Sequence, residues 1–81
     1  MNMLQIQTSI NDARMPVFIF PHEERNTYIV SIPDMNFSLE YSRDLSEADQ
    51  AEEIILHLFN MMDEETCESV ARDITRATST K

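Results

Sequence analysis

The chain of 81 residues contains no glycine, and this absence limits what it can fold into more than any other feature. Glycine makes up about 7% of ordinary sequences. Without it, Gly-rich phosphate-binding loops, nucleophile elbows and dinucleotide-binding fingerprints are all excluded. Enzymes that depend on these motifs are therefore excluded as well, and no other catalytic motif is present in their place.

Four segments in the first half have the character of β-strands. Three of them alternate apolar and polar side chains, as strands buried on one face do. The fourth, Val17–Phe20, is a continuous apolar run, which predicts a central strand covered on both faces. Asn11-Asp12, Pro16 and Pro33-Asp34 supply turn and boundary signals between them. We expect a mainly antiparallel sheet of three to four strands, at about 4–10, 17–20, 27–32 and 37–41.

The second half predicts two helices, which completes a single α+β domain over residues 1–81. Asp44 followed by Glu47 is a capping-box pattern that opens a helix over about 45–62. Its apolar stripe is expected to pack on one face of the sheet. Asp63 can cap a second helix, over about 64–78, whose small apolar face is expected to need a partner. The residues expected to be buried by the first helix are Ile54, Ile55, Leu58 and Phe59.

Little in the sequence points to catalysis or to a metal. His22 and His57 do not stand at ligand spacing from each other or from Cys67, so we expect no metal and no cofactor. Cys67 is flanked by acidic residues, which oppose a reactive thiolate and favour a buried structural cysteine. We therefore do not expect an enzyme.

The single cysteine and the hydropathy pattern indicate a cytoplasmic protein. Cys67 has no second cysteine with which to form an internal disulfide, and a reducing compartment fits this best. No apolar run approaches the roughly 20 residues that span a bilayer. The polar start, Met1–Thr8, does not have the layout of a signal peptide.

The charge balance is strongly acidic, with 15 Asp and Glu against 6 Lys and Arg and a net charge of −9. Such a chain repels nucleic acids and anionic membranes and suits a basic protein partner. Nine acidic residues and no Lys or Arg lie between Arg43 and Arg72, which predicts a negative field that steers such a partner. A solvated face that only keeps the protein soluble is an equal alternative. The candidate partner-binding residues are Glu47, Asp49, Glu52, Glu53, Met61, Glu64, Glu65 and Glu68.

The segment Pro16–Met35, with the sequence P-V-F-I-F-P-H-E-E-R-N-T-Y-I-V-S-I-P-D-M, resembles the opening of HicB-like antitoxins. In that family, a strand beginning Pro-Val, an acidic loop and a strand ending Pro-Asp-Leu or Pro-Asp-Met precede a short strand and an acidic, Ala-rich helix start. Leu45-Ser46-Glu47-Ala48 is similar to that start. The resemblance covers about half of the chain. It departs at Asn36-Phe37, where the family usually has Pro-Gly, and in the lack of a separate DNA-binding domain.

Three readings of function follow. Membership of the HicB-like family would imply an antitoxin that covers the active site of a small basic ribonuclease toxin. The alternative is a phage- or plasmid-type inhibitor that mimics nucleic acid and blocks a host nucleic-acid-binding protein. A small enzyme is the reading with the least support. A homodimer is also possible, because four strands leave two open sheet edges and the second helix has a small apolar face.

Overall fold

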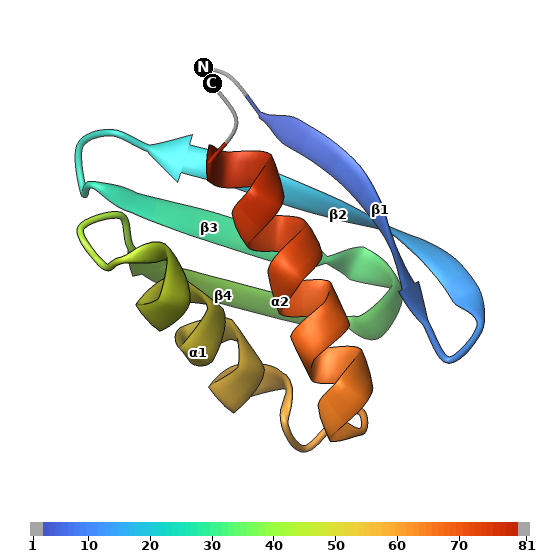
Figure 1. Ribbon diagram of the computed structural model, residues 1–81. Helices are drawn as coiled ribbons and strands as arrows, with labels where there is room; N and C mark the ends of the chain where they lie inside the picture. Colours follow the sequence, from blue (N-terminus) through green and yellow to red (C-terminus); the bar gives the residue numbers. More distant parts are fainter. Residues whose placement is uncertain (1–2, 80–81) are drawn as a thin grey trace.

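The computed structural model describes residues 3–79, which form a four-stranded antiparallel sheet followed by two helices (Figure 1). The strands follow one another in the order β1-β2-β3-β4, each pairing with the next. This arrangement confirms the predicted α+β fold. The elements are β1 (Leu4–Ile10), β2 (Ala13–His22), β3 (Thr27–Ile32), a short 3-10 helix η1 (Pro33–Met35), β4 (Phe37–Ser42), α1 (Glu47–Leu58) and α2 (Glu64–Ser79).

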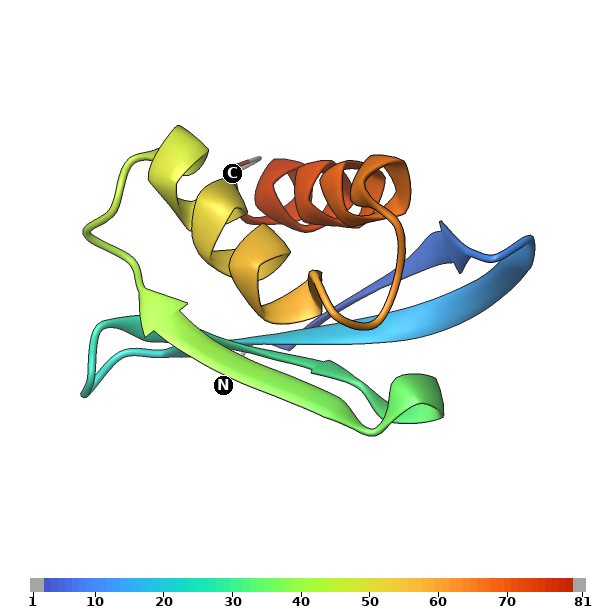
Figure 2. The same cartoon turned by 90° about the horizontal axis from the view of Figure 1, so that it is seen from below.

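Both helices lie on the same side of the sheet, as Figure 2 shows. Helix α1 packs over β4, and α2 packs over β1 and against α1. We call the side of the sheet under the helices the inner face and the opposite side the open face. The core lies between the inner face and the helices, and its fully buried apolar residues are Ile10, Val17, Ile19, Val30, Ile32, Ile54, Leu58, Cys67, Val70 and Ile74.

Strand β2 is central, as predicted, but it is not covered on both faces. Val17 and Ile19 point to the inner face and are fully buried, whereas Phe18 and Phe20 point to the open face and stay partly exposed. A continuous apolar run is compatible with a strand covered on both faces and with a strand covered on one face, because alternate residues point to opposite sides of the sheet in either case. The expectation of burial on both faces was therefore wrong.

Strand β2 is also longer than predicted, since Pro16 and Pro21 lie inside it and do not bound it. Pro16 pairs with Gln7 of β1, at a point that the β3 pairing does not reach. Pro21 pairs with Tyr28 of β3. It lies two residues beyond Ile19, at which the pairing of β2 with β1 ends. Within residues 3–79, each proline therefore has a neighbouring strand on one side only, where a missing N–H group can be tolerated.

The turns show how the chain folds without glycine. Asn11, Asp12, Asn26 and Asn36 all have positive φ, between 52° and 66°. Asn11 and Asp12 form the two-residue connection of the β1–β2 hairpin, where both central residues need φ above zero. Asn and Asp tolerate this left-handed conformation better than other residues with a side chain, so they fill the positions at which glycine is usual.

Helix α1 is shorter than predicted at both ends. Ser46, and not Asp44, is its N-cap: the Ser46 hydroxyl accepts a hydrogen bond from the Asp49 backbone N–H at 3.2 Å. Asp44 instead accepts a hydrogen bond from the Asn26 side chain at 2.8 Å, which ties the β2–β3 turn to the chain before α1. At the other end, α1 stops at Leu58 and not near Met62.

The early end of α1 changes which of its residues are buried. Ile54 and Leu58 are fully buried as predicted, and Ile55 is partly buried. Phe59, which was also expected in the core, is 63% exposed because it follows the last residue of the helix. The apolar stripe of α1 therefore ends one residue before Phe59.

Helix α2 packs within its own chain. Asp63 caps it as predicted, accepting the Thr66 backbone N–H at 2.9 Å. Thr75 and Thr78 are buried in its inner stripe because their hydroxyls donate to carbonyl groups of Ala71 and Thr75, each at 3.0 Å. With these residues added to its apolar ones, the inner face of α2 packs against α1 and β1.

Candidate functional site

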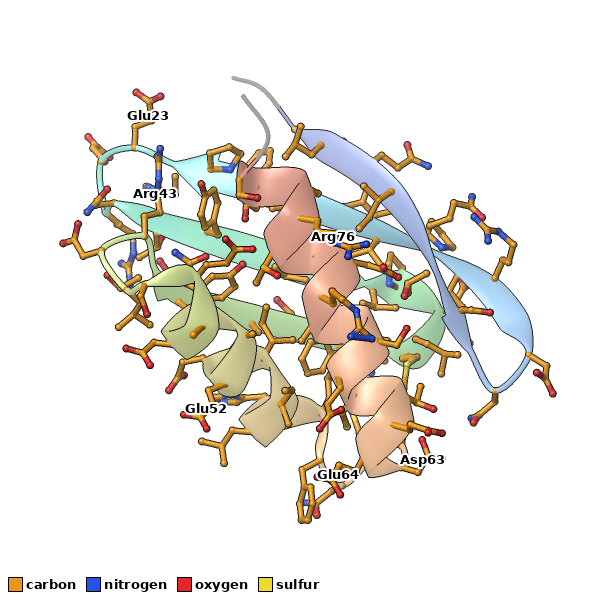
Figure 3. All side chains as sticks on the ribbon, viewed as in Figure 1. Glu23, Arg43, Glu52, Asp63, Glu64 and Arg76 are labelled. Atoms are coloured by element: carbon orange, nitrogen blue, oxygen red, sulfur yellow. The ribbon has the colours of Figure 1, made fainter. Side chains whose placement is uncertain are left out.

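The predicted partner-binding residues lie on the two helices and on the connection between them. Glu47, Asp49, Glu52 and Glu53 belong to α1, Glu64, Glu65 and Glu68 belong to the start of α2, and Met61 lies between the helices. All of them are exposed except Glu53, which is partly buried. Figure 3 shows Glu52 and Glu64 projecting outward at the end of the molecule opposite Glu23.

The outward side of α1 combines acidic and apolar side chains in one stripe. Within α1, Asp49, Glu52 and Leu56 follow one another at spacings of three and four residues, which align side chains along one side of a helix. Leu45 and Phe59 continue this spacing just outside the two ends of the helix. A shallow groove of about 520 Å³ runs along this side. Its lining residues are Leu45, Asp49, Glu52, Glu53, Ile55 and Leu56. We call these six residues, together with Phe59, the acidic–apolar face.

The packing of α1 explains why this face points to solvent. Ile54 and Leu58 are buried against the sheet, and Gln50 is buried beside them. The Gln50 side-chain amide donates to the Leu45 carbonyl at 2.9 Å, which fixes the start of the helix in this rotation. Residues on the opposite side of the helix, such as Asp49 and Glu52, are therefore held outward.

Two large apolar residues on this face are unusually accessible. Leu56 is 68% exposed and Phe59 is 63% exposed, while nearby Met61 is 40% exposed. Single apolar residues are common on protein surfaces, but several together suggest an interaction site. Leu56 and Phe59 were not predicted as site residues. The sequence could have predicted that Leu56 is exposed, because this residue lies outside the apolar stripe made by Ile54, Leu58 and their neighbours.

The carboxylates of this face have little positive charge around them. Among residues 3–79, the ion pairs join Arg25 to Glu40 at 2.7 Å and His57 to Glu53 at 4.0 Å, the second only when His57 is protonated. Neither involves the remaining acidic candidates of α1 or of the start of α2. Their negative potential is therefore directed outward, where it can attract a basic molecule.

Cys67 confirms the prediction of a buried structural cysteine. It is fully buried on the inner side of α2, and burial together with the nearby Asp63 and Glu64 carboxylates raises the pKa of its thiol. The thiol therefore stays protonated and unreactive.

Two further properties of residues 3–79 bear on the function. In this part of the chain, no three His, Cys, Asp or Glu side chains gather in a way that could hold a metal ion. Neither described helix has the length and apolar character that crossing a membrane requires.

The hydroxyl group of Tyr41 is a buried polar group that the sequence analysis did not predict. Tyr41 of β4 is only 4% exposed, and its hydroxyl has no hydrogen-bond partner among the described residues. Its ring lies 5.8 Å from that of Tyr28, over which the Arg43 guanidinium sits at 5.1 Å. Burial, with a smaller contribution from Tyr28, raises the pKa of Tyr41 well above its usual value. The alternation of Phe37, Leu39 and Tyr41 could have predicted this burial.

Fold and site together define a small α+β protein whose antiparallel meander carries two helices on one face and an acidic–apolar surface on the outer side of the first helix. The model of the YueH-like protein family matches residues 4–80, which include every strand and both helices. The chain therefore belongs to the YueH-like family. No curated protein and no solved structure matched it. The resemblance to HicB-like antitoxins is not tested by these comparisons and stays a prediction.

Proposed function

We propose that this protein is a binding module that captures a basic protein partner through its acidic–apolar face and the acidic start of α2. The observation that carries the proposal is the presence of Leu56 and Phe59, both more than 60% exposed, among the carboxylates of one helix face. A partner with a basic rim and an apolar centre would complement this surface. We place this role in the cytoplasm, where Cys67 would remain reduced.

The exposed apolar residues favour binding over solubility. A face that served only to keep the protein soluble would gain from its carboxylates and lose from each exposed large apolar side chain. Leu56 and Phe59 contribute no charge, and their contact with water is unfavourable. Covering them by a partner would release that water, while Asp49 and Glu52 would attract the partner from a distance.

The same residues favour a protein partner recognised by shape over the role of a nucleic-acid mimic. A mimic presents carboxylates where a nucleic acid would present phosphates, and a leucine and a phenylalanine between them match neither phosphate nor sugar. An antitoxin-like inhibitor of a small basic toxin, such as a ribonuclease, fits this combination. A basic open reading frame of under 100 residues beside the gene would add support.

Affinity capture with paired variants tests the proposal. The wild type and two variants would be immobilised, and partners would be eluted with a salt gradient. The Leu56→Ser/Phe59→Ser variant is expected to lose the partner, and Glu52→Gln/Glu53→Gln to release it at lower salt. Glu23→Gln/Glu24→Gln is the control, because it removes the same two charges from the exposed β2–β3 turn, which lies outside the acidic–apolar face.

The outcome depends on the contrast between these variants and not on capture alone. A basic protein that is retained by the control but lost by both helix variants would support the proposal. A partner that all variants retain equally would show that the acidic–apolar face is not its binding surface. Circular dichroism of each variant would show that the fold is intact.

A further inference from the structure

The open face of the sheet is apolar at its centre and has no described element covering it. Phe18 and Phe20 project from β2, and Ile29 lies directly across from Phe20 on β3. All three are partly exposed. Both helices pack on the other side of the sheet, as Figure 2 shows. This surface is separate from the acidic–apolar face of α1, so nothing in the proposed function accounts for it.

The margin of this face is polar but almost uncharged. The residues around the apolar centre are chiefly glutamine, serine and threonine. Among the strand residues that point to the open face, Arg14 is the basic one and Glu40 is the acidic one. Glu40 is compensated by Arg25 at 2.7 Å and by the Thr27 hydroxyl, also at 2.7 Å. The neutral polar residues of the margin are Gln5, Gln7, Ser9, Thr27, Ser31, Ser38 and Ser42.

The open face is therefore a near-neutral surface on a chain with a net charge of −9. The excess of negative charge is carried elsewhere, above all by α1 and the start of α2. Two copies that met through their helices would bring unpaired carboxylates together, which is unfavourable. Two copies that met through their open faces would direct those helices away from each other.

We propose that the open face is the interface of a homodimer, in which the sheets of two copies pack face to face. Phe18, Phe20 and Ile29 of each copy would form a shared apolar layer with a polar margin. Packed sheets lie about 10 Å apart, so the acidic outer sides of the helices would be separated by well over 20 Å. This distance exceeds the Debye length of about 8 Å at physiological ionic strength.

The size of the face predicts a weak dimer. Four strands spaced about 4.8 Å apart and about 20 Å long give roughly 400 Å² of flat area on each copy. The two copies together would bury about 800 Å², which is below the roughly 1,200–2,000 Å² of stable specific interfaces and within the range of transient ones, so we expect dissociation in the micromolar range or weaker. The exposed edges of β1 and β4 offer a different route to dimers, which the experiment separates from this one.

Sedimentation equilibrium between about 10 μM and 1 mM tests the interface. The wild type is expected to shift from 9.4 kDa toward twice that mass. Phe20→Glu should raise the dissociation constant at least tenfold. Ala48→Glu is the matched control, since it places the same new charge on an exposed position of α1 outside the acidic–apolar face and should leave dimerisation nearly unchanged. Raising the salt from about 0.01 M to about 0.15 M should tighten the dimer, because the Debye length falls from about 30 Å to about 8 Å and the repulsion between the two acidic chains is then screened.

If the Phe20→Glu variant unfolds, a second variant and a measurement on the wild-type protein can still test the proposal. Ser31→Glu adds a charge beside Phe18 without removing an apolar side chain. In the wild type, dilution should change the amide NMR shifts of Phe18, Phe20 and Ile29 more than those of α1. A monomer at 1 mM in 0.5 M salt would overturn the proposal. So would a dimer that Ser31→Glu leaves intact, or one whose dilution shifts map to the edges of β1 and β4.

Discussion

The outward sides of the two helices carry similar numbers of acidic residues but differ in their basic and apolar residues. On α2, Glu65 and Glu68 are followed by Arg72 and Arg76, and all four are exposed. On α1, Asp49 and Glu52 have no basic residue beside them and share their face with exposed Leu56. The outer side of α2 thus resembles an ordinary solvated surface that follows the helix dipole, with acid first and base last. The outer side of α1 does not, which is why we assign the centre of the binding surface to it, while the acidic start of α2 adds only to the negative field.

The largest expected effect contrasts the two sides of α1 itself. Leu58→Ala should destabilise the protein by about 2–5 kcal/mol, because Leu58 is fully buried against the sheet. Leu56→Ala should change stability by less than about 0.5 kcal/mol, as at other surface positions. Urea denaturation measures both. If Leu56→Ala costs as much as Leu58→Ala, Leu56 belongs to the core and cannot serve as a binding residue.

A second prediction concerns the sheet beneath the helices. Tyr41→Phe should stabilise the fold by about 1–2 kcal/mol, because it removes a buried hydroxyl that has no partner in the described structure. Thermal denaturation at neutral pH measures the change. A loss of more than 1 kcal/mol would show that the hydroxyl is hydrogen-bonded in solution.

The same tyrosine predicts a response to alkaline pH. Its pKa in the folded protein is raised above the value of about 10 for an unfolded chain. The folded state therefore holds the proton more tightly, and this contribution is complete below pH 10 and lost as the pH rises further. The wild type should lose stability above pH 10 more steeply than Tyr41→Phe. Equal slopes for the two proteins would contradict the burial of this hydroxyl.

The two helix caps should differ, by a smaller amount, in how their contribution to stability depends on pH. Ser46→Ala should cost about 1 kcal/mol by removing the N-cap of α1, at any pH between 3 and 8. Asp63 caps α2 with a carboxylate whose pKa is lowered by its hydrogen bonds with Thr66. Its stabilisation is present above the unfolded pKa of about 3.9 and is lost as the pH falls through the lower folded value. The stability difference between wild type and Asp63→Ala should therefore shrink in acid, unlike that for Ser46→Ala.

The strands were predictable because alternation of side chains reports directly on a sheet that is buried on one face. Where strand β2 ends was not predictable from proline alone, since Pro16 and Pro21 lie where the described part of the chain places only one neighbouring strand. The one-sided cover of Phe18 and Phe20 also depends on where both helices pack. That is a property of the whole fold and not of the local sequence.

The candidate site was predictable in its charge and not in its apolar part. The acidic residues fall in one stretch of sequence that contains no Lys or Arg, so their uncompensated charge is visible without a structure. Phe59 has the spacing of a core residue, and no glycine or proline marks the end of α1 just before it. The apolar face of α2 was predicted to be small because Thr75 and Thr78 are polar residues. The hydrogen bonds from their hydroxyl groups to backbone carbonyls of the same helix, which allow them to be buried, are not visible in the sequence.

The association rate of a confirmed basic partner is the most direct test of the binding role of α1. Stopped-flow or surface measurements would compare the wild type with Glu52→Gln/Glu53→Gln and with the control Glu23→Gln/Glu24→Gln, at about 0.05 M and 0.5 M salt. Steering by exposed charge acts on association and is screened by salt. We predict that the helix variant associates several-fold more slowly than the control at low salt, that the difference disappears at high salt, and that dissociation changes little. Equal association rates for the two variants at low salt would contradict the proposed binding role.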